Sequence, residues 1–66
     1  MNILFLGYEE NQIIDFLRQK NDVVICTDKV DIDFVKKFDY VISYGYLHII
    51  KRDVIEACKN GIINLH

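Results

Sequence analysis

The alternation of short apolar runs with amphipathic stretches constrains the fold of this chain more than any other feature of its sequence. Four runs rich in Ile, Val, Leu and Phe have the length of buried strands: residues 2–7, 22–27, 39–43 and 61–66. Three stretches between them carry apolar side chains at helical spacing: residues 8–20, 28–38 and 51–59. The pattern therefore predicts four strands that alternate with three helices.

Individual residues refine the helix predictions. Asp31 is expected to cap the second helix, and Asn60-Gly61 is expected to end the third, because glycine tolerates the left-handed turn. The side chains expected to face inward are the apolar ones of each helix: Ile13, Ile14, Phe16 and Leu17 in the first, Ile32, Val35 and Phe38 in the second, and Val54, Ile55 and Cys58 in the third.

Strands that are joined by helices are expected to be parallel, with right-handed crossovers, in a Rossmann-like α/β fold of three layers. If the second strand lies beside the first, and the third returns to its other side, the strand order is 2-1-3-4. This order places a topological switch between the first and third strands, where ligands bind outside the carboxyl ends. We therefore expect residues 7–9, residues 44–46, Asn64 and His66 to lie along one rim.

A chain of 66 residues, 52% of them hydrophobic, is too apolar for a disordered segment and short for a complete domain. A core of this size is marginal. We expect residues 1–66 to be the N-terminal part of one larger domain, or to associate with further copies through the open edge of the fourth strand. A complete and monomeric module is the alternative.

Charge and cysteine content narrow the function classes. The formal charge is −2, with Lys and Arg scattered singly or in pairs, so direct nucleic-acid binding by this segment is not expected. Cys26 and Cys58 stand in apolar runs outside any metal-ligand spacing, which predicts free thiols and no metal site. The sequence has neither a secretory leader nor a membrane-spanning run, and we expect a cytoplasmic protein.

The run at residues 61–66 ends on two polar side chains, Asn64 and His66. Because side chains alternate along a strand, these two are expected on one face, with Ile63 and Leu65 on the other. A carboxamide and an imidazole can both donate hydrogen bonds, and the imidazole also exchanges protons near neutral pH. The pair is compatible with a carbonyl-handling site, or with a strand end that meets water.

Residues 43–50 form a second candidate site, in which glycine permits close backbone approach and aromatic side chains could enclose a flat heterocycle. The alternative is a loop whose tyrosines cover the end of the sheet. His48 is interpreted as a solvated loop residue, since no second metal-ligand candidate is near it in sequence. Around Gly7, two glutamates and the lack of a glycine-rich motif disfavour a dinucleotide site.

Together, residues 39–50 and 61–66 resemble the N-terminal half of the folate-dependent formyltransferases, which act on methionyl-tRNA, sugar nucleotides or glycinamide ribonucleotide. The family pattern is a strand D-x-V-V-x-x-G followed by Tyr or Phe, then two aliphatic residues, and later a strand that ends in N-x-H. The fit to the glycinamide ribonucleotide enzyme is weakest, because its phosphate-binding first loop is missing and the second crossover is short.

The resemblance implies transfer of a formyl group from N10-formyltetrahydrofolate to an amine, either on a small molecule such as a sugar nucleotide or on tRNA. It implies that Asn64 and His66 are two of three catalytic residues, and that the donor pocket is lined by Tyr44, Gly45, Tyr46, Leu47 and Ile49. The third catalytic residue of the family, an aspartate, and its P-S-x-L-P loop have no counterpart in residues 1–66. We therefore expect the isolated chain to be inactive; a small non-catalytic binding or regulatory module is the alternative.

Overall fold

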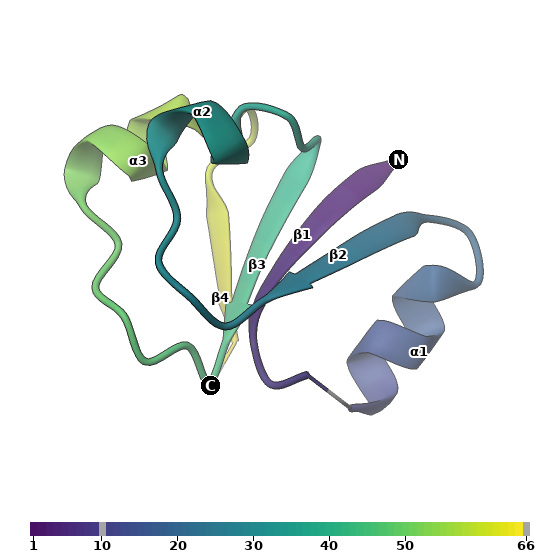
Figure 1. Cartoon of the computed structure of the whole chain (residues 1–66). Coiled ribbons are helices and arrows are strands. Elements are labelled where there is room, and N and C mark those ends of the chain that lie inside the picture. The colour runs from purple at the N-terminus through teal and green to yellow at the C-terminus, as the bar shows by residue number, and fades with distance from the viewer. Residues whose placement is uncertain (10, 66) are drawn as a thin grey trace.

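The computed structural model describes residues 1–9 and 11–65 and contains a four-stranded sheet with three helices. In chain order the elements are β1 (Asn2–Gly7), α1 (Gln12–Arg18), β2 (Asp22–Cys26), α2 (Ile32–Val35), β3 (Tyr40–Tyr44), α3 (Arg52–Ala57) and β4 (Ile62–Leu65). All neighbouring strands are parallel, and their order is β2-β1-β3-β4 (Figure 1). The predicted Rossmann-like α/β fold and strand order are both confirmed.

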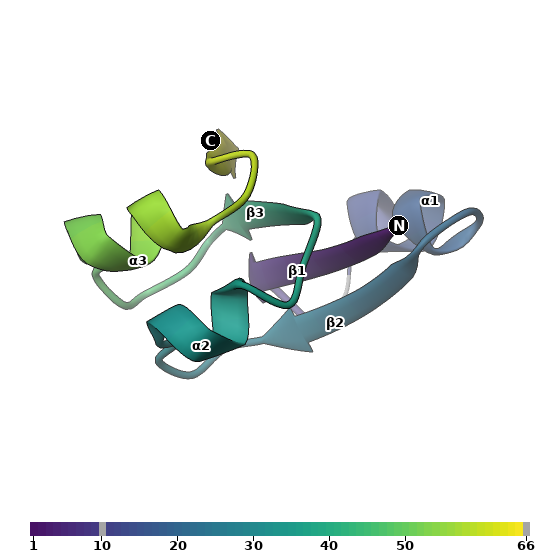
Figure 2. The same ribbon diagram turned by 90° about the horizontal axis from the view of Figure 1, so that it is seen from above.

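The sheet is the middle of three layers, with α1 on one face and α2 and α3 on the other (Figure 2). β1 lies at the centre, and its side chains alternate between the two cores. Leu4 and Leu6 pack with the α2 and α3 residues, whereas Ile3 and Phe5 pack on the α1 side. Burial of each such side chain stabilises the fold by about 1.5–3 kcal/mol, which explains why β1 is the most apolar strand.

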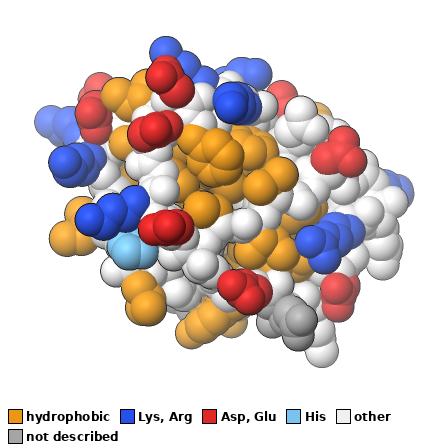
Figure 3. Space-filling model, viewed as in Figure 1, with side chains coloured by type: hydrophobic (Ala, Val, Ile, Leu, Met, Phe, Trp, Pro, Cys, Tyr) orange, Lys and Arg blue, Asp and Glu red, His pale blue; other side chains and the backbone are white. Residues whose placement is uncertain are grey.

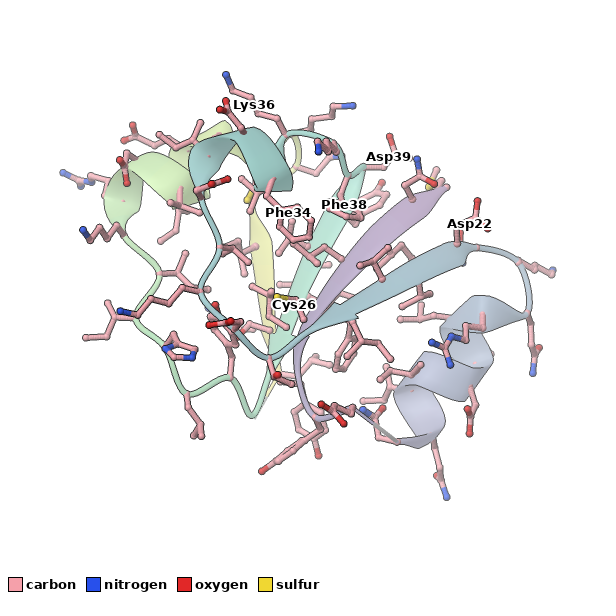
Figure 4. The ribbon with its side chains drawn as sticks, viewed as in Figure 1. Asp22, Cys26, Phe34, Lys36, Phe38 and Asp39 are labelled. Carbon is pink, nitrogen blue, oxygen red and sulfur yellow. The ribbon has the colours of Figure 1, made fainter. Side chains whose placement is uncertain are left out.

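The helices contain only seven, four and six residues, and they depend on caps and on tertiary packing. Asn11 Oδ1 accepts a hydrogen bond from the Ile14 amide at 3.0 Å, and Asp31 Oδ1 accepts one from the Phe34 amide at 2.8 Å. The predicted cap at Asp31 is therefore confirmed. Phe34 and Phe38 then pack edge to face at 5.2 Å over the sheet (Figure 4).

Asp39 connects the amino ends of three strands, at the edge opposite the predicted rim (Figure 4). Its Oδ2 accepts a hydrogen bond from the Asn2 amide at 2.9 Å, and its own amide donates to the Asn2 carbonyl at 2.8 Å. The side chain of Asn60 donates to the Asp39 carbonyl at 2.7 Å, just before β4 begins. These bonds join the start of β4 to the amino ends of β1 and β3.

Three expectations about burial were wrong. Phe16 is 71% exposed because it lies beside the stripe that Ile13, Ile14 and Leu17 present to the sheet. Ile55 is 42% exposed and lines a groove instead of the core. β2 is half-buried and not fully buried, because it forms an edge of the sheet, although Val23 and Ile25 pack on the α1 side.

Within residues 1–9 and 11–65, no helix combines the length and the hydrophobicity that crossing a membrane requires.

Candidate active site at the carboxyl ends of the strands

The loops after β1 and β3 meet at the rim, as the strand order predicts. The Tyr8 amide donates a hydrogen bond to the Tyr44 carbonyl at 3.0 Å. Gly7 has a φ of 122°, and a β-carbon there would overlap the Tyr44 carbonyl oxygen. Gly45 has a φ of 72°, and a β-carbon there would enter the ring of Tyr8. Glycine is therefore required at both positions, because the two loops cross without room for a side chain.

Asn64 lies one strand further along the same rim, directly beside Ser43 in the register of β3 and β4. It faces the α2 and α3 side, where it lines a groove of about 320 Å³ together with Ser43, His48, Ile50, Ile55 and Ile62. We call this the strand-end groove. Leu65 packs on the opposite, α1 side, so the predicted alternation along β4 is confirmed from Asn64 to Leu65. The predicted partner, His66, lies outside the described residues.

His48 is the residue that sequence reasoning missed. Its side chain is half-buried, lines the strand-end groove with Asn64, and packs its ring against that of Tyr46 at 5.4 Å. A period of two could have revealed it, because Tyr46, His48 and Ile50 are half-buried while Leu47 and Ile49 are exposed. Alternate side chains of this irregular segment, which bends at Gly45 and again at His48, thus turn toward the protein.

Leu47 and Ile49 are 94% and 93% exposed and stand at the lip of a second groove of about 840 Å³. We call this the outer groove. One wall consists of residues 29–33, from the loop after β2 and the start of α2, and the other consists of residues 47–49, 51, 53 and 54. His48 lines both grooves and therefore stands where they adjoin.

Charges of both signs surround the hydrophobic surface on this side of the molecule (Figure 3). In the outer groove, one wall carries Lys29, Asp31 and Asp33, and the other carries Lys51 and Asp53. Two of these are already used by the backbone, since Asp31 caps α2 and Asp53 accepts a hydrogen bond from the Val54 amide at 2.8 Å. Within residues 1–9 and 11–65, no cluster of three or more His, Cys, Asp or Glu side chains could hold a metal ion.

The other predicted donor-binding residues divide between the two faces of the sheet. Tyr44 packs on the α1 side, edge to face with Phe5 at 6.5 Å and with Tyr8 at 4.9 Å, and it lines none of the grooves described here. Gly45, Tyr46 and Leu47 border a third groove, of about 480 Å³, together with Gly7, Tyr8, Glu9 and Thr27. The structure thus brings Tyr46 close to His48 and leaves Tyr44 apart from Asn64.

Two groups have a raised pKa, Tyr46 at the rim and Cys58 at the end of α3. The hydroxyl of Tyr46 donates to the Asp28 carbonyl at 2.5 Å, and burial, followed by the nearby Cys26 and Asp28, raises the pKa of this tyrosine. Burial likewise raises the pKa of the Cys58 thiol, which donates to the Val54 carbonyl at 3.4 Å. Both groups therefore keep their protons at neutral pH and act as donors.

The strand-end groove has the composition of a small-molecule site. Its walls are formed by the aliphatic side chains of Ile50, Ile55 and Ile62, and its polar groups are Ser43, His48 and Asn64. Such apolar pockets with a few polar groups bind flat organic ligands and orient them by hydrogen bonds. The carboxamide of Asn64 can donate to a carbonyl oxygen held in this groove.

No protein-family model matches the chain. Among solved structures, it is similar to the formyltransferase PseJ from Anoxybacillus kamchatkensis, whose crystal structure is a complex with UDP-4,6-dideoxy-4-formamido-L-AltNAc and tetrahydrofolate. The identity is 39% and the TM-score is 0.85 over 100% of this chain, which spans 36% of the PseJ chain. The chain thus shares the fold of the segment of this formyltransferase that it matches, and it spans about a third of that protein.

Proposed function

We propose that the chain is part of a formyltransferase that moves a formyl group from N10-formyltetrahydrofolate to an amine of a sugar nucleotide. The observation that carries the proposal is the 39% identity over the whole chain to PseJ, a formyltransferase solved with tetrahydrofolate and a formamido sugar nucleotide. An acceptor amine on tRNA has no comparable support, and the net charge of −2 gives no reason to expect a phosphate backbone as partner.

Asn64 and His66 are the catalytic residues in this proposal. The acceptor nitrogen attacks the formyl carbon, the bond from that carbon to N10 breaks, and a proton passes from the acceptor nitrogen to N10. The Asn64 carboxamide donates to the formyl oxygen, on which negative charge develops, and His66 carries the proton. The position of Asn64 supports its part, because its exposed carboxamide lies in a groove beside Ser43 and His48, where it can reach the carbonyl oxygen of a bound ligand.

The donor is held by the segment after β3, with Tyr44, Gly45, Tyr46, Leu47 and Ile49 as the residues that the family resemblance assigns. The structural support differs among them. Tyr46, Leu47 and Ile49 border the outer groove or the third groove, whereas Tyr44 supports the loop from the α1 side. We add Ser43, His48 and Ile50 to the donor site, because they share the strand-end groove with Asn64.

Formyl transfer by this proposal needs groups beyond residues 1–66. The chain spans 36% of PseJ, and the resemblance places a third catalytic residue, an aspartate, elsewhere in the enzyme. We therefore expect the isolated chain to show no formyl transfer above the uncatalysed rate. Measurable turnover by the purified chain would contradict this expectation.

The direct test is a hybrid enzyme in which residues 1–66 replace the matching segment of PseJ. The hybrid is expected to formylate the PseJ acceptor, because the two segments share one fold at a TM-score of 0.85. Asn64→Ala in the hybrid is expected to lower kcat by about 10²- to 10³-fold with little change in KM for the donor, as for the loss of one oxyanion donor.

Asn60→Ala is the matched control, since Asn60 lies at the opposite end of β4 from Asn64 and its side chain donates a hydrogen bond to the Asp39 carbonyl. It should leave kcat within a few-fold of the unsubstituted hybrid. If Asn64→Ala and Asn60→Ala have equal turnover, the catalytic role of Asn64 is wrong. If the unsubstituted hybrid folds, binds tetrahydrofolate and yet transfers no formyl group, the proposed function is wrong.

A further inference from the structure

A hydrogen bond to the backbone carbonyl of Asp28 joins the two loops that lead into the walls of the outer groove, which also meet in the hydrophobic core. The hydroxyl of Tyr46 donates to this oxygen at 2.5 Å, and the thiol of Cys26 approaches it at 3.6 Å. Asp28 directly precedes the wall of residues 29–33, and Tyr46 directly precedes the wall that begins at Leu47. The bond therefore joins the two walls at their common base.

This bond crosses the topological switch of the sheet. Asp28 follows β2 and Tyr46 follows β3, and these strands lie on either side of β1. The two residues are 18 positions apart in sequence, so nothing in the local backbone holds them together. A tyrosine side chain has two main rotatable bonds and loses little conformational freedom when its ring is packed, which makes it a stiff connector.

The ring of Tyr46 also sets the position of the residue that stands where the two grooves adjoin. The His48 imidazole packs against it at 5.4 Å with an interplanar angle of 64°. His48 lines the strand-end groove beside Asn64 as well as the outer groove. Any movement of the Tyr46 ring would therefore change both the separation of the walls and the direction of the imidazole.

We propose that Tyr46 is a positioning residue, whose hydrogen bond to the Asp28 carbonyl holds the walls of the outer groove at a fixed separation and directs His48 toward Asn64. The Tyr46 hydroxyl donates its hydrogen to the Asp28 carbonyl and so does not donate to the ligand. It affects the ligand site indirectly, through the position of the loop backbone and of His48. The raised pKa of Tyr46 agrees with this role, because the hydroxyl keeps the proton that it donates. The role of Tyr46 in ligand binding rests on the proposed function, whereas its role in joining the loops after β2 and β3 does not.

The test uses the whole 66-residue chain with Tyr46→Phe, which removes the hydroxyl and keeps the ring. Tyr40→Phe is the matched control, because Tyr40 lies at the amino end of the same strand, β3, and no hydrogen bond of its hydroxyl is seen among the described residues. Amide hydrogen exchange, read by NMR, compares residues 29–33 and 47–51 with the core strand β1. The imidazole resonances of His48 report its surroundings in the same spectra.

Tyr46→Phe is expected to speed exchange in both walls by about 2- to 10-fold, the effect of one neutral hydrogen bond, without an equal change in β1. It should also shift the His48 resonances, whereas Tyr40→Phe should do neither. Equal exchange in the walls of both variants, or a uniform change over the whole chain, would overturn the proposal, since a merely structural role affects all amides alike.

The second readout is the Kd for tetrahydrofolate, measured by titration of the same samples. Tyr46→Phe is expected to weaken binding by about 2- to 10-fold, and Tyr40→Phe is expected to leave it unchanged. Unaltered binding in Tyr46→Phe would overturn the positioning of the ligand site. If the unsubstituted chain bound no tetrahydrofolate, the donor assignment would fail, and the exchange data would still decide whether Tyr46 joins the walls.

Discussion

Gly7 and Gly61 offer a matched pair of substitutions, because both have positive φ but only one lies against another strand. The φ values are 122° and 71°. A β-carbon at Gly7 would overlap the Tyr44 carbonyl oxygen and approach the Tyr46 amide, whereas a β-carbon at Gly61 would meet no atom within 4 Å. The difference between Gly7→Ala and Gly61→Ala therefore isolates the close approach of the loops after β1 and β3.

The two costs can be estimated from the contacts. Positive φ at a residue with a β-carbon costs about 1–3 kcal/mol, and the reduced entropy of the unfolded chain returns about 0.4–1 kcal/mol in both variants. At Gly7 the overlap also forces apart the Tyr8 amide and the Tyr44 carbonyl, whose 3.0 Å hydrogen bond contributes about 0.5–1.5 kcal/mol. We expect a loss of about 2 kcal/mol for Gly7→Ala and of about 1 kcal/mol for Gly61→Ala.

Urea unfolding followed by circular dichroism and tyrosine fluorescence measures both losses. With a slope of about 1 kcal/mol per molar urea for a small domain, the two midpoints should differ by about 1 M. A chain of this size has a total stability of about 3–10 kcal/mol, so a loss of about 2 kcal/mol for Gly7→Ala is large enough to measure. Equal midpoints for the two variants would refute the reasoning, because they would mean that the two loops can separate at no cost.

Three further substitutions test other parts of the fold. Asp31→Ala should lower stability by about 1 kcal/mol and Asp31→Asn by much less, because only alanine loses the acceptor for the Phe34 amide; thermal unfolding of the two variants checks this. Leu4→Ala, at the fully buried centre of β1, should cost about 2–5 kcal/mol in urea unfolding, and a loss below 1 kcal/mol would contradict its place in the core. Burial raises the pKa of the Cys58 thiol above its ordinary value of 9.0. The buried thiol therefore contributes its full stabilisation below pH 9.0, and this stabilisation is lost as the pH rises through the higher pKa of the folded state. Unfolding measured from about pH 7 to 10.5 should show this loss of stability, and Cys58→Ala should reduce the pH dependence.

The residue pattern determined the architecture of this protein. The short apolar runs admit only parallel strands with helical crossovers, and from them followed the order β2-β1-β3-β4, the cap at Asp31 and the meeting of the loops at Gly7 and Gly45. The alternation along β4 likewise placed Asn64 and Leu65 on opposite faces. These features depend on local propensity and on the period of two or 3.6 residues, which are readable in the sequence.

The sequence pattern did not show which side chains outside the strands would converge. His48 and Asn64 share a groove because β3 and β4 are neighbours and the irregular segment after β3 passes beside the end of β4, and neither fact is local to His48. Ile55 lines the strand-end groove and is therefore exposed, although its helical spacing fits a core position. The bond from Tyr46 to Asp28 joins loops that only the sheet order brings together. Periodicity thus determined which face each strand residue occupies, and tertiary packing decided which loop residues meet, because that depends on contacts between segments far apart in the chain.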